Sequence, residues 1–173
     1  AVAYLQGEYP EALAGKRVSV IPTCADLDRF MPRSRTPTAG PSIHGCFGTI
    51  LSGWFRTDWL AAWMRAAAAR DSQVLFDVVT RDDAAQVRAA LDPDGVLGDR
   101  LRIGGRRPEA MPETVRGHDV SVMFFTGGRS KLGSSPTRMG EALGSGLPVV
   151  VNADVGDVAR IVSDHRVGVV LEG

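Results

Sequence analysis

Short apolar segments alternate with helical segments from residue 43 onward, and this alternation constrains the fold more than any other feature of the chain. Segments that are both short and apolar are typical of strands buried on both faces of a parallel sheet. We expect such strands at residues 43–48, 74–80, 101–103, 120–125, 148–151 and 167–171. We expect the intervening helices at residues 58–70, 82–91, 108–116, 136–145 and 155–163.

This order of elements predicts the α/β class, with a doubly wound, mostly parallel, Rossmann-like sheet and helices on both faces. Such sheets bind ligands beyond the carboxyl ends of their strands. Residues 1–42 break the alternation, because a helix end and then a strand and a turn within 17–32 precede a Pro-, Ser- and Thr-rich stretch at 33–42. We therefore expect a leading segment and interdomain connector at 1–42 and one domain at 43–173, with both ends cut from a longer protein.

Charge and cysteine content exclude several kinds of partner. The 173 residues carry 20 Lys and Arg and 20 Asp and Glu, so no net charge attracts nucleic acid. No apolar run is long enough to cross a membrane and no signal peptide is visible, so we expect a cytoplasmic protein that reaches a membrane only through parts outside this sequence. Cys24 and Cys46 are expected to be reduced, mostly buried thiols, and we expect no metal and no cofactor.

The most informative motif is SSPTRMGEALGSGLPVVV, at residues 134–151. It predicts a helix with a marked start, followed by a buried strand. Ser135 suits the N-cap, and Pro136 suits the first helical position, where its missing N–H costs nothing. Gly146 suits the C′ position that closes the helix.

The polar start of this helix predicts an anion site. Free backbone N–H groups there carry a partial positive charge, Ser134, Ser135 and Thr137 add hydroxyls, and Arg138 adds a cation. Glu141 lies about 9 Å farther along the helix axis, at about 1.5 Å per residue, where a carboxylate could accept hydrogen bonds from a ribose. Alternatively, Arg138 and Glu141 form a surface pair contributing about 0.2–0.5 kcal/mol, and the residues alone leave both interpretations open.

Two other segments carry weaker signals. Trp59 and Trp63 are spaced to share one helix face behind an Asp58 cap, and we interpret that face as core packing. Asp157 follows a predicted strand and suits a cap or first-turn carboxylate of the next helix.

The segment at 134–162 resembles the donor-binding segment of retaining GT-B fold glycosyltransferases of the family 4, or group 1, type. It is most similar to a bacterial subgroup with Ser-Pro-Thr-Lys, a glutamate three residues on, and Gly-Leu-Pro-Val-Val. VIPTCADLDRFMP at 20–32 resembles the stretch that enters the C-terminal domain of these enzymes. HGCFGTILSGWF at 44–55 resembles the first glycine-bearing loop of that domain, and GVVLEG at 168–173 resembles its last strand.

The resemblance implies a donor-nucleotide-binding domain from an enzyme that transfers a sugar, of hexosyltransferase type, from a nucleoside diphosphate sugar to an acceptor. It implies a missing N-terminal acceptor-binding domain, catalytic residues that cannot be assigned here, and an isolated chain without activity. The donor diphosphate is placed against Ser134, Ser135, Thr137 and Arg138. The ribose is placed on Glu141. The first glycine loop is represented by Gly48, Thr49 and Gly53, and the base-binding region by Arg81 and Arg107.

Three positions depart from the family pattern. Gly133 stands where the family has a second acidic residue, which leaves the contact to the transferred sugar unassigned; Lys131 is a candidate for part of that charge pattern. The usual Arg and Lys of the first loop are matched only by Arg56. Residues 23–26, Thr-Cys-Ala-Asp, stand where the family has Asn-Gly-Val-Asp.

Two other classes of function share the predicted type of sheet. A non-catalytic Rossmann-like module that binds a nucleotide or a protein has the same fold. A nicotinamide dehydrogenase is disfavoured, because no Gly-x-Gly-x-x-Gly follows the first strand with an acidic residue about 20 positions on.

Overall fold

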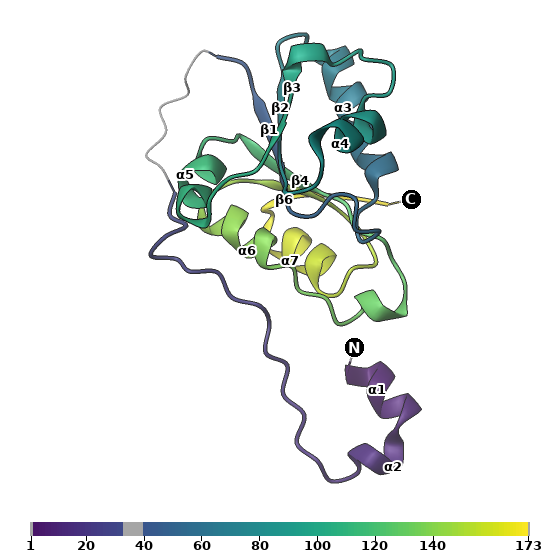
Figure 1. The fold of residues 1–173 in the computed structure, drawn as a ribbon. Coiled ribbons are helices and arrows are strands. Elements are labelled where there is room, and N and C mark those ends of the chain that lie inside the picture. The colour runs from purple at the N-terminus through teal and green to yellow at the C-terminus, as the bar shows by residue number, and fades with distance from the viewer. Residues whose placement is uncertain (1, 33–39, 173) are drawn as a thin grey trace.

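The computed structural model describes residues 2–32 and 40–172. Its centre is a six-stranded sheet in the order β3-β2-β1-β4-β5-β6, and every neighbouring pair of strands is parallel (Figure 1). The strands are β1 (Ile43–Phe47), β2 (Leu75–Val79), β3 (Leu101–Gly104), β4 (Val120–Met123), β5 (Val149–Asn152) and β6 (Gly168–Leu171). The predicted doubly wound sheet is confirmed, and its strand order reverses between β1 and β4.

Helices cover both faces of the sheet. α3 (Thr57–Arg70) and α4 (Ala84–Leu91) lie on one face, and α5 (Met111–Arg116), α6 (Thr137–Gly144) and α7 (Val158–His165) lie on the other (Figure 1). The described connections between strands and helices also contain three short 3₁₀ turns, η1 (Gly98–Arg100), η2 (Pro108–Ala110) and η3 (Arg129–Lys131). In the described part of the chain, no helix has the length and apolar content that crossing a membrane requires.

The core lies on both faces of the central strands. All four residues of β5 are buried, because it is flanked by β4 and β6 and packed against α6 and α7. Trp59 and Trp63 pack against the buried Phe124, with ring centroids 5.7 and 6.5 Å away. The predicted core role of the two tryptophans is therefore confirmed. Burial raises the pKa of the Cys46 thiol in β1 to about 12.

Two helix starts differ from the prediction by one or two residues. The N-cap of α6 is Pro136 rather than Ser135, and no side chain caps this helix. Asp58 is not the cap of α3 either, because it lies inside the first turn and binds the side chain of the actual N-cap, Arg56, at 2.7 Å. Asp157 is the N-cap of α7 as expected, although its carboxylate accepts no capping hydrogen bond. Both serines before Pro136 remain available to line the cleft described below.

The far end of α6 closes as the sequence predicts. Gly146 has φ +76°, and its N–H donates to the Leu143 carbonyl at 2.9 Å. The next N–H, that of Leu147, donates to the Ala142 carbonyl at 3.0 Å. This pair of bonds is a Schellman motif, which requires the left-handed backbone that glycine adopts without a Cβ penalty.

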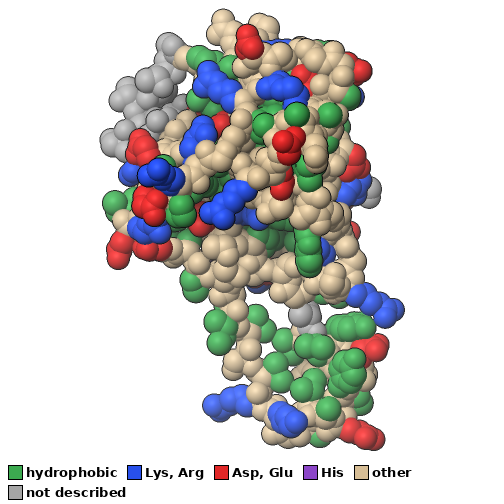
Figure 2. Space-filling view, viewed as in Figure 1, with side chains coloured by type: hydrophobic (Ala, Val, Ile, Leu, Met, Phe, Trp, Pro, Cys, Tyr) green, Lys and Arg blue, Asp and Glu red, His purple; other side chains and the backbone are tan. Residues whose placement is uncertain are grey.

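The leading segment contains α1 (Val2–Glu8) and α2 (Pro10–Leu13), which lie apart from the sheet in Figure 1. Hydrophobic side chains gather over this part of the molecule in Figure 2. Leu5 and Tyr9 of the leading segment are exposed. Tyr4 of α1 touches the main body, because its hydroxyl lies 3.4 Å from the Arg129 guanidinium.

The strand expected within residues 17–32 does not form. That stretch runs without a sheet partner among the described residues and leaves Val20 and Ile21 exposed; Cys24 is exposed as well, contrary to expectation. The stretch then packs on α6, where a Cβ on Gly144 would lie 2.8 Å from the side chain of Leu27. Residues 33–39, which make up most of the Pro-, Ser- and Thr-rich stretch at 33–42, lie outside the described residues.

A half-buried histidine bridges β1 and α3. The indole N–H of Trp63 donates to Nδ1 of His44 at 3.1 Å, and the His44 ring stands edge-on to Phe76 with centroids 5.6 Å apart. An indole nitrogen can only donate, so the His44 ring carries no proton at Nδ1. Burial lowers the pKa of His44 from 6.5, against the opposing effect of Asp119 and Asp71.

We expect the free energy of unfolding to decrease as pH falls below about 6.5. The unfolded chain takes up a proton at His44 more readily than the folded chain, because the pKa of His44 is lower in the folded state. The contribution of neutral His44 to the free energy of unfolding is therefore complete above pH 6.5 and decreases as the pH falls from 6.5 to the pKa of the folded state. His44→Gln keeps an acceptor for Trp63 and should flatten this slope by up to about 1.4 kcal/mol per pH unit. Urea unfolding from pH 5 to 8 compares the two chains, and identical slopes would exclude His44 as the source.

Candidate functional site

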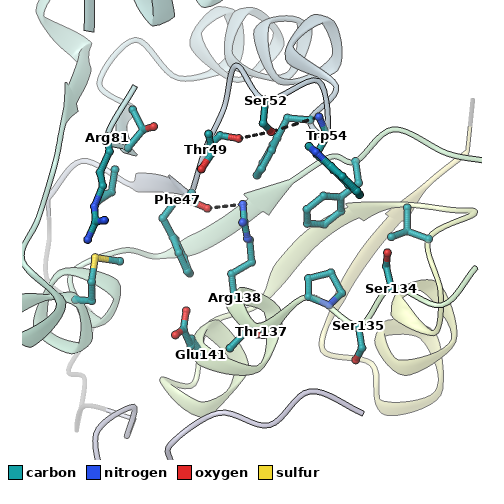
Figure 3. Close-up of a pocket in the computed structure, with 18 of the residues that line it drawn as sticks. Phe47, Thr49, Ser52, Trp54, Arg81, Ser134, Ser135, Thr137, Arg138 and Glu141 are labelled. Atoms are coloured by element: carbon teal, nitrogen blue, oxygen red, sulfur yellow. Dashed lines mark hydrogen bonds between the residues drawn. The ribbon is translucent and has the colours of Figure 1, made fainter. Parts of the chain in front are cut away.

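A cleft of about 840 Å³ opens beyond the carboxyl ends of β1, β2, β3 and β4. Its walls come from the loops that follow these strands and from the start of α6, as Figure 3 shows. This is the edge at which a doubly wound sheet places its ligands, because the strand order reverses there and the loops on either side diverge. Eight of the ten predicted binding residues line this cleft: Gly48, Thr49, Arg81, Ser134, Ser135, Thr137, Arg138 and Glu141.

Arg138 reaches from α6 across the floor of the cleft. Its Nη1 donates to the carbonyl oxygen of Phe47 at 2.8 Å, at the end of β1 (Figure 3). The guanidinium carbon lies 4.7 Å from the ring centroid of Phe55 and 5.7 Å from that of Phe125. A Cβ on Gly48 would collide with the same Nη1, so only glycine leaves room for this arginine.

Arg138 and Glu141 therefore do not form the surface ion pair that the sequence alone allowed. Within the described residues the arginine is paired with a backbone carbonyl and two rings, and it has no ion-pair partner. Glu141 is half-buried on the same wall, and burial raises the pKa of its carboxyl group although Arg138 and Arg29 act to lower it. Both side chains face the cleft rather than bulk solvent.

Two residues that support the cleft were not predicted from the sequence. The carboxylate of Asp82 accepts the N–H groups of Ile50 and Leu51 at 2.5 and 3.0 Å and the hydroxyl of Thr80 at 3.0 Å, which fixes the loop after β1. An aspartate shortly after a strand was a usable signal for such a role. Arg29 donates to the carbonyl of Pro108 at 2.8 Å and lies within electrostatic range of Glu141; nothing in its local sequence marks it.

The other two predicted residues lie outside the cleft. Gly53 belongs to the first loop, but it does not line the cavity, and nothing lies within 4 Å of the place where its Cβ would be. Arg106 lines the cleft in place of the predicted Arg107. Its Nη2 lies 3.8 Å from the Asp77 carboxylate. The chain is extended here, so consecutive side chains point to opposite sides and only one of the two arginines faces inward.

The cleft is cationic although the chain as a whole is neutral. Its charged lining comprises Arg81, Arg106, Lys131, Arg138 and Glu141. One carboxylate among four cations favours a ligand with more than one negative charge. Among the described residues, no group of His, Cys, Asp and Glu is arranged to hold a metal ion.

No protein-family model matches the sequence, and no curated protein matches it either. Solved structures do match. WaaG, a glycosyltransferase involved in lipopolysaccharide biosynthesis, superposes with a TM-score of 0.74 and 19% identity over 99% of this chain and 46% of its own. The C-terminal domain of LpcC, a group 1 family glycosyl transferase from Francisella tularensis, gives 0.63 and 17% over 85% of this chain and 79% of its own. The fold is that of one lobe of a GT-B glycosyltransferase.

This GT-B lobe spans about half the length of WaaG. The pneumococcal O-GlcNAc transferase GtfA, solved in complex with UDP and GlcNAc, has the same lobe, with a TM-score of 0.52 and 16% identity over 88% of this chain and 29% of its own. At these identities the likeness establishes the fold, and the roles of individual residues have to be argued from the cleft itself.

Proposed function

We propose that this GT-B lobe binds the nucleotide of a nucleoside diphosphate sugar, for an enzyme that transfers the sugar to an acceptor. The observation that carries the proposal is the cleft at the strand-order reversal, where the start of α6 and four cationic side chains meet. Phosphates are the anions that such a helix start and such arginines bind best. GtfA, which contains a lobe of this fold, was solved in complex with UDP, and this supports a nucleoside diphosphate as the ligand.

The lining residues suggest how the donor lies. The first N–H groups of α6 have no partner within the helix, so with the hydroxyls of Ser134, Ser135 and Thr137 they suit the diphosphate. Glu141 lies one helical turn further on and suits the ribose hydroxyls. Arg81, at the opposite end of the cleft from Trp54 in Figure 3, then faces the base.

The proposed contribution to the reaction is electrostatic. When the bond to the sugar breaks, negative charge grows on the leaving diphosphate. Donors that already point at that position stabilise this charge without reorganising, and the start of α6 and the Arg138 guanidinium are such donors. The acceptor and the remaining catalytic groups belong, in this proposal, to a second lobe of the same protein.

Titration of the chain with UDP, GDP, ADP and CMP tests the proposal. We expect one nucleotide to bind preferentially, and weakly, because closure of a second lobe completes such a site. We expect no glycosyl transfer by this chain alone. Isothermal calorimetry measures binding, and the absence of binding to all four nucleotides would contradict the proposal and favour a non-catalytic protein-binding module.

A further inference from the structure

The side chain of Lys131 is buried at the edge of the cleft without a polar partner. The residue is only 5% exposed, and it lines the cleft together with Trp54. Its ammonium nitrogen lies 3.0 Å from the centroid of the Trp54 ring. Within residues 2–32 and 40–172 this nitrogen makes no hydrogen bond and no ion pair, so the indole face is its stabilising contact.

A lysine covered to this degree is normally paired with a carboxylate or carbonyl oxygen. The Lys131 ammonium is not fully closed off from solvent, so it stays open to the cleft. Among the described residues no oxygen accepts its three N–H groups, and the cation–π contact leaves them able to donate to a ligand there. Burial accordingly lowers the pKa of Lys131. Arg138 differs, because its Nη1 already donates to the Phe47 carbonyl and its guanidinium packs against two rings, which leaves its other N–H groups for a ligand.

Both partners are fixed to the walls of the cleft by their backbones. The Trp54 carbonyl accepts the N–H of Thr126 at 3.0 Å, and the adjacent Phe55 forms an antiparallel bridge with Phe125. The Lys131 carbonyl accepts the N–H of Ser134 at 3.0 Å, which ties the lysine to the approach to α6. The lysine is therefore tied through its backbone to Ser134, which lines the same cleft and belongs to the proposed diphosphate site.

We infer that Lys131 binds the sugar-side phosphate of the donor, and that Trp54 holds the ammonium on its ring until that phosphate arrives. The inference rests on the proposed function. A phosphate oxygen offers a charge-assisted hydrogen bond, which is stronger than the contact with the ring, so the ligand displaces Trp54 from the ammonium. Trp54 thus competes with the phosphate for the Lys131 ammonium, and Lys131 completes the set of cations around the phosphate.

The first test is the affinity of the chain for inorganic pyrophosphate and for uridine. Lys131→Met keeps the length of the side chain and removes its charge, and it should weaken pyrophosphate binding about tenfold to a hundredfold and leave uridine binding unchanged. Lys16→Met is the matched control, because Lys16 is the only other lysine in the sequence, is exposed and does not line the cleft. Calorimetry gives both affinities, and circular dichroism verifies that each variant is folded.

The second test uses the competition with Trp54, which predicts an effect of opposite sign. Trp54→Leu should strengthen pyrophosphate binding about threefold to tenfold, because the ammonium no longer leaves a ring to reach the phosphate. The same change in the Lys131→Met chain should have no effect. Weaker binding after Trp54→Leu in both backgrounds would mean that the ring itself holds the ligand and would overturn the inference.

The two proposals fail in different ways. If the unmodified chain binds a nucleoside diphosphate and Lys131→Met binds it equally well, the inference about Lys131 is wrong and the proposed function stands. If the unmodified chain binds neither pyrophosphate nor any nucleotide, the proposed function is wrong and the inference falls with it.

Discussion

Arg138→Ala is expected to weaken the binding of a nucleoside diphosphate by about tenfold to a hundredfold, the cost of one charge-assisted contact. The structure adds a second reason for a large effect. Arg138 also holds the Phe47 carbonyl at 2.8 Å and packs on Phe55 and Phe125, so its removal takes away one of the contacts that hold the loop after β1. Calorimetric titration with UDP and with pyrophosphate should show that both ligands are affected.

Glu141→Gln is the companion variant, because it is isosteric and lies on the same helix. It should weaken binding of the nucleoside diphosphate through the ribose and leave pyrophosphate binding nearly unchanged. Arg138→Ala would then affect both ligands and Glu141→Gln only the nucleotide, because Glu141 lies about 6 Å along the helix axis from the first residue of α6, at about 1.5 Å per residue. Unchanged affinities of the Arg138→Ala chain for UDP and pyrophosphate would show that Arg138 supports the loop after β1 and does not bind the ligand.

Gly156→Ala is expected to cause the largest loss of stability, about 2–4 kcal/mol in the free energy of unfolding. Gly156 has φ +49°, and a Cβ at this position would collide with the carbonyl oxygen of Ser134. The obstacle is backbone at the edge of the cleft, so either the loop after β5 or the approach to α6 has to move. Pyrophosphate affinity should fall as well, because Ser134 is displaced from the proposed anion site.

Gly98→Ala provides the matched control for this prediction. Gly98 has φ +53°, nearly the same left-handed backbone, but nothing lies within 4 Å of the place where its Cβ would be, so only the backbone strain of about 1 kcal/mol remains. Urea unfolding of both variants separates the strain from the collision. Equal losses of stability in the two chains would show that the contact between Gly156 and Ser134 is unimportant.

The architecture of the sheet was predictable because its signals are local. The valine run of β5 and the short apolar segments of the other strands predict elements of a buried sheet, and the residues between them carry helical patterns. β6 is less buried than predicted, since it lies at the edge of the sheet and Val169 is exposed. The end of α6 was predictable for the same reason, since the Schellman motif at Gly146 involves only neighbouring residues. The start of α6 differed by one residue, because Pro136 could serve as the cap as readily as the first helical position.

The candidate site was predictable in part. The motif at 134–151 identified the helix start, Arg138 and Glu141, and all of them face the cleft. The sequence could not show that Arg138 binds the Phe47 carbonyl, 91 positions away, because no local pattern encodes a contact between the end of β1 and the first turn of α6. The choice of Arg106 over Arg107 likewise depends on which way an extended segment is turned against the sheet.

By itself, the sequence determined the order of strands and helices, and with it the edge of the sheet at which a ligand can bind. Only the tertiary structure decided what each charged side chain meets there. Asp82 fixes the loop after β1, and Lys131 reaches the Trp54 ring, because the winding of the sheet brings the loops after β1, β2 and β4 together. The periodicity of apolar residues indicates which faces of a helix or strand are buried. Which side chains meet across a cleft depends instead on how elements distant in the sequence pack together.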